Sequence, residues 1–286
     1  MGNGKVTLRF GTGGTPHSAR RPDPLSGVER IAALGLSAME LEFVHGVRIR
    51  DDAAENIRRR AEELGVALTC HGPYYINLNA VEPEKRQASV ERIIATARAA
   101  RRVGAHSITF HAAFYLKQEP GSVHQTVQDA LVRIVEALSA EGNDVQIRPE
   151  LTGKPSQYGD LEELLKLSQA IPRVRPCIDF SHLHARTGGA MNSAEEFRAV
   201  LTRYREVLGK QSLTDLHLHI SGIQYTAKGE QRHLDLVEAD LRYRELLQAL
   251  AEEDARGIVI CESPNLEEDA QLLQSTYQKL LAGKKR

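Results

Sequence analysis

The chain has 286 residues, of which 41% are hydrophobic and 26% carry a charged side chain. This is enough apolar material for one large α/β barrel or for two ordinary domains. The formal net charge of −1 gives no global argument for nucleic-acid binding and leaves a local basic face open. There is no apolar run of about 18 residues and no apolar signal core at the start, so we expect a cytoplasmic protein without a transmembrane helix.

Eight short β-rich runs alternate with segments of helical hydrophobic spacing. Strands are expected at residues 6–10, 38–43, 67–71, 107–111, 145–150, 174–182, 215–221 and 257–262. Helices are expected at about residues 25–34, 51–65, 84–103, 122–140, 160–171, 193–208, 239–256 and from 266 onward. The glycine-rich residues 11–16 are expected to form a tight turn after the first strand, with phosphate binding as the alternative. Eight β/α units of this size predict a single-domain (β/α)₈ TIM barrel over residues 1–286. A doubly wound open sheet is the alternative.

Nearly every expected strand ends in a histidine or a carboxylate. These residues are Glu42, His71, His111, Glu150, Asp179 with His182, His219 and Glu262. In a parallel barrel all strand C-termini open onto one face, so we expect these side chains to converge there. Mixed nitrogen and oxygen ligands suit Zn²⁺, Mn²⁺ or Fe, and a carboxylate such as Glu150 can bridge two ions. The pattern predicts a metal centre at this mouth, although each residue alone also fits a hydrogen-bonded loop position.

The seventh strand carries two histidines on one face, because the side-chain period of a strand is two. His219 is nearer the mouth and is the better ligand, whereas His217 is expected one layer deeper as a buried polar group. The following residues 225–236 are very polar. We interpret them as a loop that holds a further ion or contacts an anionic substrate, or as a plain solvated loop.

The three cysteines, Cys70, Cys177 and Cys261, each lie one or two residues before a candidate ligand. They are too few for a disulfide framework in a chain of this length. We interpret them as small apolar residues of the barrel core, with thiolate ligation of a metal as the alternative.

Five segments of the chain match motifs of a known family. They are residues 71–78 (HGPYYINL, against HxxYxINL), 149–154 (PELTGK, against an ENTAG-type segment), 177–182 (CIDFSH, against CIDTCH), 219–222 with 229–233 (HISG and GEQRH, against HxND and DRH) and 261–264 (CESP, against ETP). The third match is the most specific. On these motifs the chain resembles the endonuclease IV family, within the wider group of xylose-isomerase-like barrels.

The resemblance implies a trinuclear zinc site that hydrolyses the DNA phosphodiester 5′ to an abasic site. For this chain we expect two or three zinc ions, with manganese as another choice. By position, the ligand sets would be His71, His111 and Glu150; Glu150, Asp179, His219 and Glu262; and His182 and His233 with a carboxylate. Glu150 and Glu262 are the expected catalytic carboxylates. Tyr74 matches the aromatic residue that lies near the flipped-out sugar. Damaged duplex DNA would be the partner of a monomer, with no protein partner and no membrane.

The chain also departs from the family pattern. The family's aspartate for the third ion falls at Gln231, so that Glu230 or Asp235 would have to replace it or the ion would be missing. The first-strand histidine and the turn after His111 do not match either. The expected substrate contacts are Tyr74, Asn77, Lys154, Lys228 and Arg232, and they are joined by Arg48, Arg50 and Arg186 if these share the mouth. Ordinary surface charge is the alternative for these basic residues.

Two other functions remain open on the same barrel. In a sugar isomerase or epimerase, Glu150 and Glu262 would act as acid and base around one Mn²⁺ or Mg²⁺ held by Asp179 and His219. In a non-cleaving homologue, the protein would grip DNA without cutting it. The histidine-rich set favours several ions and therefore the nuclease.

Overall fold

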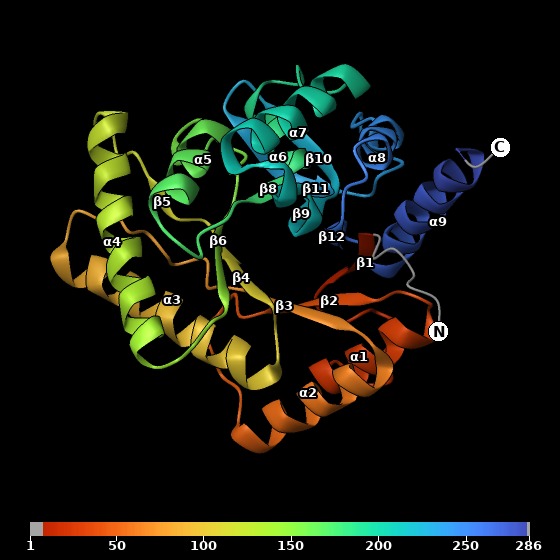
Figure 1. The fold of residues 1–286 in the computed structure, drawn as a ribbon, viewed down its shortest axis with the longest axis horizontal. Coiled ribbons are helices and arrows are strands. Elements are labelled where there is room, and N and C mark those ends of the chain that lie inside the picture. Colours follow the sequence, from red (N-terminus) through yellow and green to blue (C-terminus); the bar gives the residue numbers. More distant parts are fainter. Residues whose placement is uncertain (1–7, 285–286) are drawn as a thin grey trace.

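The computed structural model describes residues 8–284, and its centre is a barrel of eight parallel strands (Figure 1). The strands run in the order β6–β4–β3–β2–β1–β12–β9–β8. Isolated parallel bridges, Ile147 to Val174 and Glu150 to Cys177, connect the two edges β6 and β8. The sheet is thereby nearly closed, and the predicted (β/α)₈ barrel is confirmed. The strands are β1 (Leu8–Gly13), β2 (Ala38–Glu42), β3 (Ala67–His71), β4 (Ser107–Phe110), β6 (Gln146–Pro149), β8 (Cys177–Asp179), β9 (Leu216–Ile220) and β12 (Gly257–Cys261).

Helices form the outer layer around the barrel. They are α1 (Pro24–Ala33), α2 (Asp51–Leu64), α3 (Pro83–Val103), α4 (Pro120–Ala140), α5 (Leu161–Ala170), α6 (Phe180–Arg186), α7 (Ala194–Leu208), α8 (Tyr243–Glu252) and α9 (Glu267–Gly283), with a 3₁₀ turn η1 (Lys210–Thr214). Local signals set several ends. A capping box between Asp160 and Glu163 starts α5, and Gly65 and Gly104 end α2 and α3 in the left-handed region. None of the helices in the described part of the chain has the length and apolarity of a membrane span.

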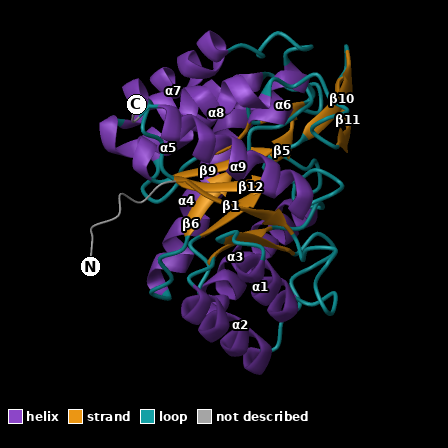
Figure 2. Ribbon diagram, turned by 90° about the vertical axis from the view of Figure 1, so that its right-hand side faces the viewer, coloured by secondary structure: helices purple, strands orange, loops and turns teal. Residues whose placement is uncertain are grey.

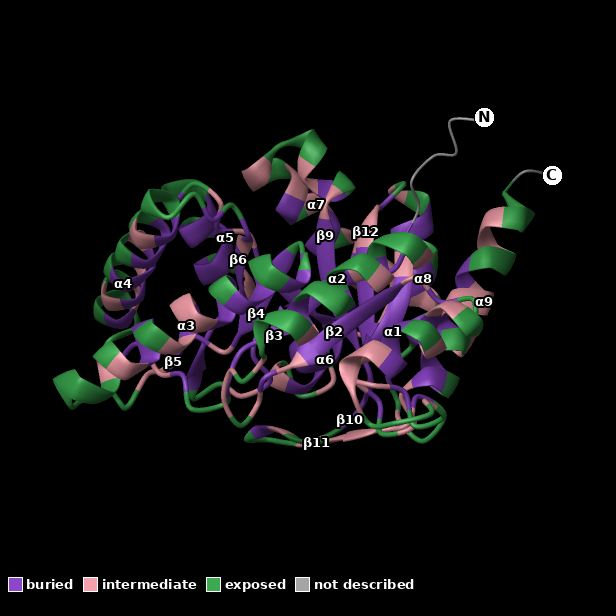
Figure 3. Cartoon of the chain, turned by 90° about the horizontal axis from the view of Figure 1, so that it is seen from below, coloured by how far each residue is buried: buried purple, intermediate pink, exposed green. Residues whose placement is uncertain are grey.

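The core lies between the barrel and its helices. Figure 3 shows the barrel strands largely buried and many exposed residues on the outward faces of the helices. All five residues of β9 are buried, because the barrel interior covers one face of the strand and helices cover the other. The side chains that face the helices are aliphatic, such as Leu216 and Leu218, whereas the interior holds a polar layer that includes His217 and His219. The polar layer positions the candidate site.

The first strand continues past its expected end at Phe10 and runs to Gly13. Its expected first residues, 6 and 7, lie outside the described range. Gly11 was expected in a turn, but here it lets β1 approach β2. A Cβ at this position would lie 1.8 Å from the carbonyl oxygen of Ala38. Glycine serves close backbone approach as well as turns, and the sequence alone does not distinguish the two.

Two further expectations near the mouth were wrong. The sixth strand was expected over residues 174–182, but β8 ends at Asp179 and the short helix α6 begins at Phe180. The polar residues 225–236 were expected as a loop, but most of them form an antiparallel hairpin of β10 (Gly222–Thr226) and β11 (Gly229–Leu234). The hairpin lies beyond the ends of the barrel strands, at the right-hand edge of Figure 2. A second small ladder pairs β5 (Ala113–Phe114) with β7 (Gln157–Tyr158).

The remaining boundaries agree with expectation to within two residues, apart from those of α8. That helix was expected over residues 239–256 and spans only Tyr243–Glu252. Hydrogen-bonded turns flank it, with the Glu238 amide donating to Asp235 and the Asp254 amide donating to Ala251. The helical spacing of apolar residues in the sequence thus extends into the turns on both sides of α8, although these turns are not helical in the folded chain.

Candidate metal centre

Glu150 lies at the centre of the mouth, directly after β6, and its side chain is 1% exposed. Four imidazoles surround it. The Nε2 atoms of His71 and His111 lie 3.1 and 3.4 Å from its Oε2 atom. The Nδ1 atoms of His182 and His219 lie 3.1 and 3.4 Å from its Oε1 atom. The two carboxylate oxygens therefore face two different pairs of histidines.

The first donor group consists of His71 at the end of β3, His111 after β4, and Glu150. Their donor atoms all lie within 4.8 Å of one another. The Nδ1 atom of His71 lies 2.7 Å from the Gly72 carbonyl oxygen, which can only accept a proton. His71 therefore carries its proton on Nδ1 when neutral and turns Nε2 toward the centre, as metal-bound histidines commonly do.

The second group combines Glu150, Asp179, His219 and Glu262, again with donor atoms within 4.8 Å of one another. Asp179 caps helix α6 through its Oδ1 atom, which accepts the His182 amide at 2.8 Å. Its Oδ2 atom is left for the centre. Burial raises the pKa of Asp179, with Glu262 and Glu150 adding to the shift. Three carboxylates packed this closely repel one another, and a cation would remove that repulsion.

Buried polar atoms without partners test whether the second group suits a cation. The Glu150 Oε1, Asp179 Oδ2 and His219 Nδ1 atoms have no hydrogen-bond partner within residues 8–284. An unsatisfied buried polar atom costs about 1–3 kcal/mol, and more if it is charged. Because these three atoms face one another, a divalent cation would satisfy all of them at once. The residues therefore fit a metal ion.

The third group contains His182 and His233, with Asp179 nearby. The Nδ1 atom of His182 lies 3.0 Å from the Leu151 carbonyl oxygen, and Nδ1 of His233 lies 3.0 Å from the Glu262 carbonyl oxygen. In both rings Nδ1 lies against a backbone carbonyl oxygen, so both Nε2 atoms remain available to coordinate a metal ion. The ring centroids lie 5.6 Å apart.

A β-bulge decides which acidic residue of the hairpin joins the third group. Glu230 pairs with Tyr225, and Arg232 pairs with Gln224, so Gln231 has no partner in the ladder. The extra residue shifts the alternation, and Glu230 and His233 both face the cavity although they are three positions apart. The Glu230 Oε2 atom lies 3.6 Å from Nε2 of His182. Asp235 instead accepts the Asn265 amide at 3.1 Å.

A cavity of about 380 Å³ opens above these groups. It is lined by His71, Tyr74, Ile76, His111, Phe114, Glu150, Lys154, Gln157, His182, Glu230, His233 and Glu262. Of the expected substrate contacts, Tyr74 and Lys154 line the cavity, and Asn77, Lys228 and Arg232 do not. Asn77 accepts the Asn79 and Phe114 amides and so holds its loop. Lys228 lies in the exposed turn of the hairpin, and Arg232 donates to Gln224 on its outer side.

The other basic residues expected near the mouth have different environments. Arg186 is bound to the loop after β6, where its guanidinium donates to the carbonyl oxygens of Lys154 and Gln157. Arg50 pairs with Asp52 at the exposed start of α2. Neither these two nor Arg48 lines the cavity. Among the described residues that line the cavity, Lys154 is thus the one lysine or arginine.

Two carboxylates of β2 lie beside the centre: Glu42, one of the strand-end residues expected at the mouth, and Glu40, which the sequence did not single out. Glu42 and Glu40 form a further group with Glu262, in which one carboxylate oxygen of each residue lies within 4.8 Å of the others. Burial raises the pKa of Glu42 to about 8. Glu40 is fully buried below the mouth. Burial raises the pKa of Glu40, but the His219 and His217 imidazoles lower it more, to well below its usual range. The strand-end position indicated Glu42, whereas the alternation along the strand was the only signal for Glu40.

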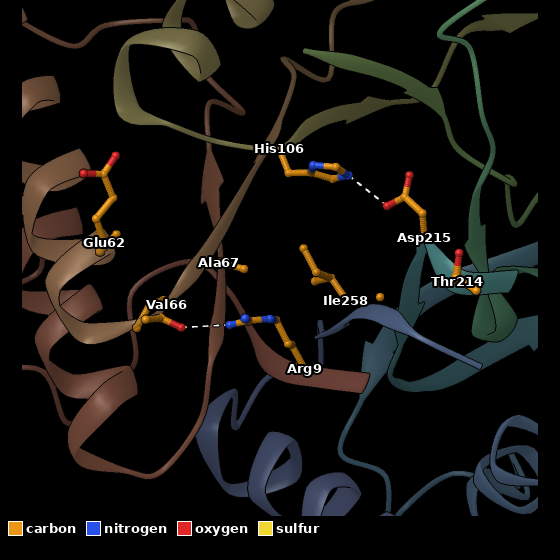
Figure 4. A pocket seen from close by; sticks show the side chains of 11 residues that line it. Arg9, Glu62, Val66, Ala67, His106, Thr214, Asp215 and Ile258 are labelled. Carbon is orange, nitrogen blue, oxygen red and sulfur yellow. Dashed lines mark hydrogen bonds and ion pairs between the residues drawn. The ribbon is translucent and has the colours of Figure 1, made fainter. Parts of the chain in front are cut away.

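The N-terminal end of the barrel has a cavity of similar volume, about 400 Å³, but a different character. Figure 4 shows the His106 ring directed at the Asp215 carboxylate and the Arg9 guanidinium at a backbone oxygen. The Nε2 to Oδ1 distance is 2.8 Å, and Arg9 donates to the Gly65 carbonyl oxygen. None of the metal-compatible groups found in the described residues includes a residue that lines this cavity. The metal-compatible groups of the described residues therefore lie away from this cavity, at the C-terminal mouth.

Comparison with known proteins agrees with this geometry. Residues 28–280 match the family described as the xylose isomerase-like TIM barrel. The chain belongs to this family. A protein of Methanocaldococcus jannaschii, itself uncharacterized, is 43% identical over 278 residues, 97% of this chain and 100% of that protein. A probable endonuclease 4 of Halorhodospira halophila is 24% identical over 216 residues, 72% of each chain. The family resemblance seen in the motifs is confirmed.

Solved structures show that the fold is shared by proteins with different activities. The endonuclease IV of Thermus thermophilus has a TM-score of 0.72 at 20% identity, covering 96% of this chain and 99% of that one. A D-tagatose 3-epimerase-like protein has a TM-score of 0.71 at 17% identity, covering 98% and 100%. The two TM-scores differ by only 0.01, so structural similarity does not favour either activity and the residues of the site must be considered.

Proposed function

We propose that this protein is a metal-dependent hydrolase that cleaves the DNA phosphodiester bond 5′ to abasic sites. The observation that carries the proposal is the set of four imidazoles around Glu150. Two of these imidazoles face one carboxylate oxygen and two face the other, which supports several cations rather than one. An epimerase centred on one cation needs only the group of Asp179, His219, Glu150 and Glu262.

The donor groups suggest where the ions would bind. His71, His111 and Glu150 would hold one ion, and Glu150 would share a second with Asp179, His219 and Glu262. Nitrogen and oxygen donors without a thiolate suit Zn²⁺, and Mn²⁺ is the next choice. Such ions, when bound, polarise a phosphodiester and lower the pKa of water.

We assign different roles to the two expected catalytic carboxylates. Glu150 has both oxygens among imidazoles and would serve as a ligand in both groups. Glu262 is 15% exposed and lines the cavity, so a water molecule reaches it more easily. Glu262 is therefore the better candidate to accept the proton of the attacking water.

The cavity edge suits a nucleic-acid substrate. Tyr74 is 64% exposed, and its ring is in edge contact with His71 at a centroid distance of 5.9 Å. An exposed aromatic ring beside a metal centre can stack on an unpaired sugar or base. Lys154 offers an ammonium group to the adjacent phosphate. Lys228 and Arg232, on the hairpin surface, would contact only DNA that extends beyond the cavity.

We further propose that Glu230 supplies the carboxylate of a third ion, with His182 and His233. Its position 3.6 Å from His182 supports this role, and Gln231 is exposed on the bulge. The Glu230 amide donates to the Gly153 carbonyl oxygen at 2.9 Å, which holds this part of the hairpin against the loop after β6. Glu230 would thereby replace the aspartate of the family pattern, whose position Gln231 occupies in this chain.

The sugar epimerase is the second candidate. The TM-scores of 0.72 and 0.71 favour neither activity, and a cavity of about 380 Å³ is large enough for a monosaccharide. In that case Glu150 and Glu262 would move protons at a sugar carbon. His71, His111, His182 and His233 would have no evident role, and this is why we place the epimerase second.

The first prediction tests the proposed function directly. The purified protein should carry two or three zinc or manganese ions per chain and should nick duplex DNA that contains an abasic-site analogue. Chelation should abolish the nicking, and metal should restore it. Elemental analysis and gel electrophoresis of labelled DNA measure both. Intact DNA after metal reconstitution, together with turnover of a free ketose, would refute the nuclease.

Tyr74→Ala provides a matched variant for this assay. The side chain is largely exposed, so its loss should leave folding and metal content unchanged while slowing the nicking by about 10-fold or more, as for other aromatic stacking contacts worth about 1–3 kcal/mol. Tyr75→Ala is the control, because Tyr75 is equally exposed and does not line the cavity. Equal effects of the two substitutions would contradict the assigned role of Tyr74.

A further inference from the structure

A polar cluster lies one layer below the candidate metal centre, inside the barrel. It consists of Glu40 on β2, Thr69 on β3, and His217 and His219 on β9, and all four are at most 1% exposed. The roles assigned above use only His219. A charged carboxylate at this depth is costly unless it is paired, so the cluster needs an explanation.

Glu40 is held by three contacts. Its Oε2 atom accepts the Thr69 hydroxyl at 2.7 Å and lies 3.1 Å from Nε2 of His217. Its Oε1 atom lies 3.0 Å from Nε2 of His219. His217 is fixed on its other side, where Nδ1 lies 3.2 Å from the Ser107 hydroxyl. The Thr69 contact is a hydrogen bond, whereas the two imidazole contacts are ion-pair distances, because Glu40 Oε1, His217 Nε2 and His219 Nε2 form no hydrogen bond within residues 8–284. The carboxylate therefore has one oxygen beside each of two histidines.

His219 is the connection between this cluster and the metal centre. Its Nδ1 atom faces upward, 3.4 Å from Glu150 Oε1 and 3.3 Å from Glu262 Oε1. Its Nε2 atom faces downward to Glu40. A carboxylate beside one ring nitrogen keeps the proton on that nitrogen, which leaves the lone pair of the other nitrogen for a metal. Glu40 thus selects the tautomer of His219 that a ligand in the mouth requires.

We propose that Glu40 is a positioning residue that orients His219 and sets its tautomer for metal binding, with His217 and Thr69 holding Glu40 in place. The inference rests on the metal centre of the proposed function, and it is independent of the substrate. It assigns a role to the acidic alternation in β2 and to the deeper histidine of β9.

The test is metal affinity in the full-length protein. Glu40→Gln keeps the side-chain shape and removes the charge. Its affinity for one of the zinc ions, measured in competition with a chromophoric chelator, should fall by about 10- to 100-fold, the usual effect of losing such a partner. The other ions should bind as before. The visible spectrum of the Co²⁺-substituted protein should also change, because the ring of one ligand is no longer fixed.

Asp215→Asn is the matched control. Asp215 forms an ion pair with the fully buried Arg148 at 2.7 Å, toward the opposite end of the barrel. This variant should unfold more easily and should keep wild-type zinc affinity and the wild-type Co²⁺ spectrum. A Glu40→Gln protein with unchanged affinities and spectrum would overturn the inference. So would equal losses in both variants, which would mean that stability alone controls binding.

A second variant separates positioning from direct ligation. Cys177, His217 and His219 also have donor atoms within 4.8 Å of one another. Cys177→Ser should leave the metal content unchanged if Glu40 only positions His219. Loss of one ion equivalent and of a thiolate-to-Co²⁺ band would replace the inference with a deep metal site. Metal affinities that follow the expectation in a protein that does not nick DNA would refute the nuclease and keep the role of Glu40.

Discussion

At the scale of single residues, the candidate centre depends on how each histidine uses its two nitrogens. His71, His182 and His233 each place Nδ1 against a backbone carbonyl oxygen. A carbonyl oxygen accepts and never donates, so in the neutral form the proton stays on Nδ1 and Nε2 is available. His219 is reversed, with Nε2 against Glu40. Three of these rings are thus oriented by backbone carbonyl oxygens and the fourth by the Glu40 carboxylate.

Glu230 gives the sharpest prediction at this scale. Glu230→Gln should reduce the bound metal by up to one ion per chain and leave the ions at Glu150 in place, because only the third group loses its carboxylate. Elemental analysis after gel filtration measures the content. Gln231→Ala is the control, since Gln231 is exposed on the same strand. A loss of metal in Gln231→Ala but not in Glu230→Gln would contradict the assignment of Glu230 to the third group.

At the scale of elements, two short irregular features shape the mouth. Helix α6 starts where β8 ends, and Asp179 serves both as its cap and as a donor toward the centre. The bulge in β11 turns Glu230 and His233 to the same side. Tyr225 of β10 donates its hydroxyl to Asp240, which also contacts the buried His184 of α6. The hairpin is therefore attached to the helix that carries His182.

The close contact between β1 and β2 leaves no room for a side chain at Gly11. Gly11→Ala should lower the free energy of unfolding by about 3 kcal/mol, at the upper end for overpacked positions, because its Cβ would overlap the Ala38 backbone. Urea denaturation measures the change. Gly121→Ala is the control, since a Cβ there meets nothing within 4 Å in helix α4. Similar stabilities for the two variants would contradict the close approach.

At the scale of the whole molecule, the barrel separates stability from function by its two ends. The N-terminal end has paired charges, with Asp215 contacting both Arg148 and His106. The C-terminal mouth collects carboxylates and imidazoles, of which several atoms have no hydrogen-bond partner in the range 8–284. This division is general in TIM barrels, where loop ends carry the chemistry and the opposite face contributes stability.

Metal removal should therefore affect the whole molecule. Chelation should lower the thermal unfolding midpoint, because each ion present at about 100 times its Kd stabilises the folded state by roughly 2.7 kcal/mol. Scanning calorimetry before and after metal removal measures the shift. Asp179→Asn, which has lost one ligand charge, should be less sensitive to the chelator. An unchanged midpoint for the wild-type protein would argue against bound ions.

The sequence alone determined the barrel and most of the candidate ligands. Alternating β and α patterns with Gly65 and Gly104 as helix stops depend on local propensity, which short segments contain by themselves. His71, Asp179 and Glu262 were found because strand ends must meet at one mouth once the strands are parallel. The motif match then grouped them into sets that coincide with the clusters of the structure.

Only the tertiary structure decided which side of each strand faces the interior. Glu40 and Glu42 alternate with Met39 and Leu41, and the sequence pattern does not tell a solvated face from a polar barrel interior. The bulge that exchanges Gln231 for Glu230 depends on the pairing partner in β10, which lies outside the local segment. Asn77, Lys228 and Arg232 were separated from the cavity for the same reason. The direction of a side chain depends on how the barrel closes and how its strands pair, and both are properties of the folded chain.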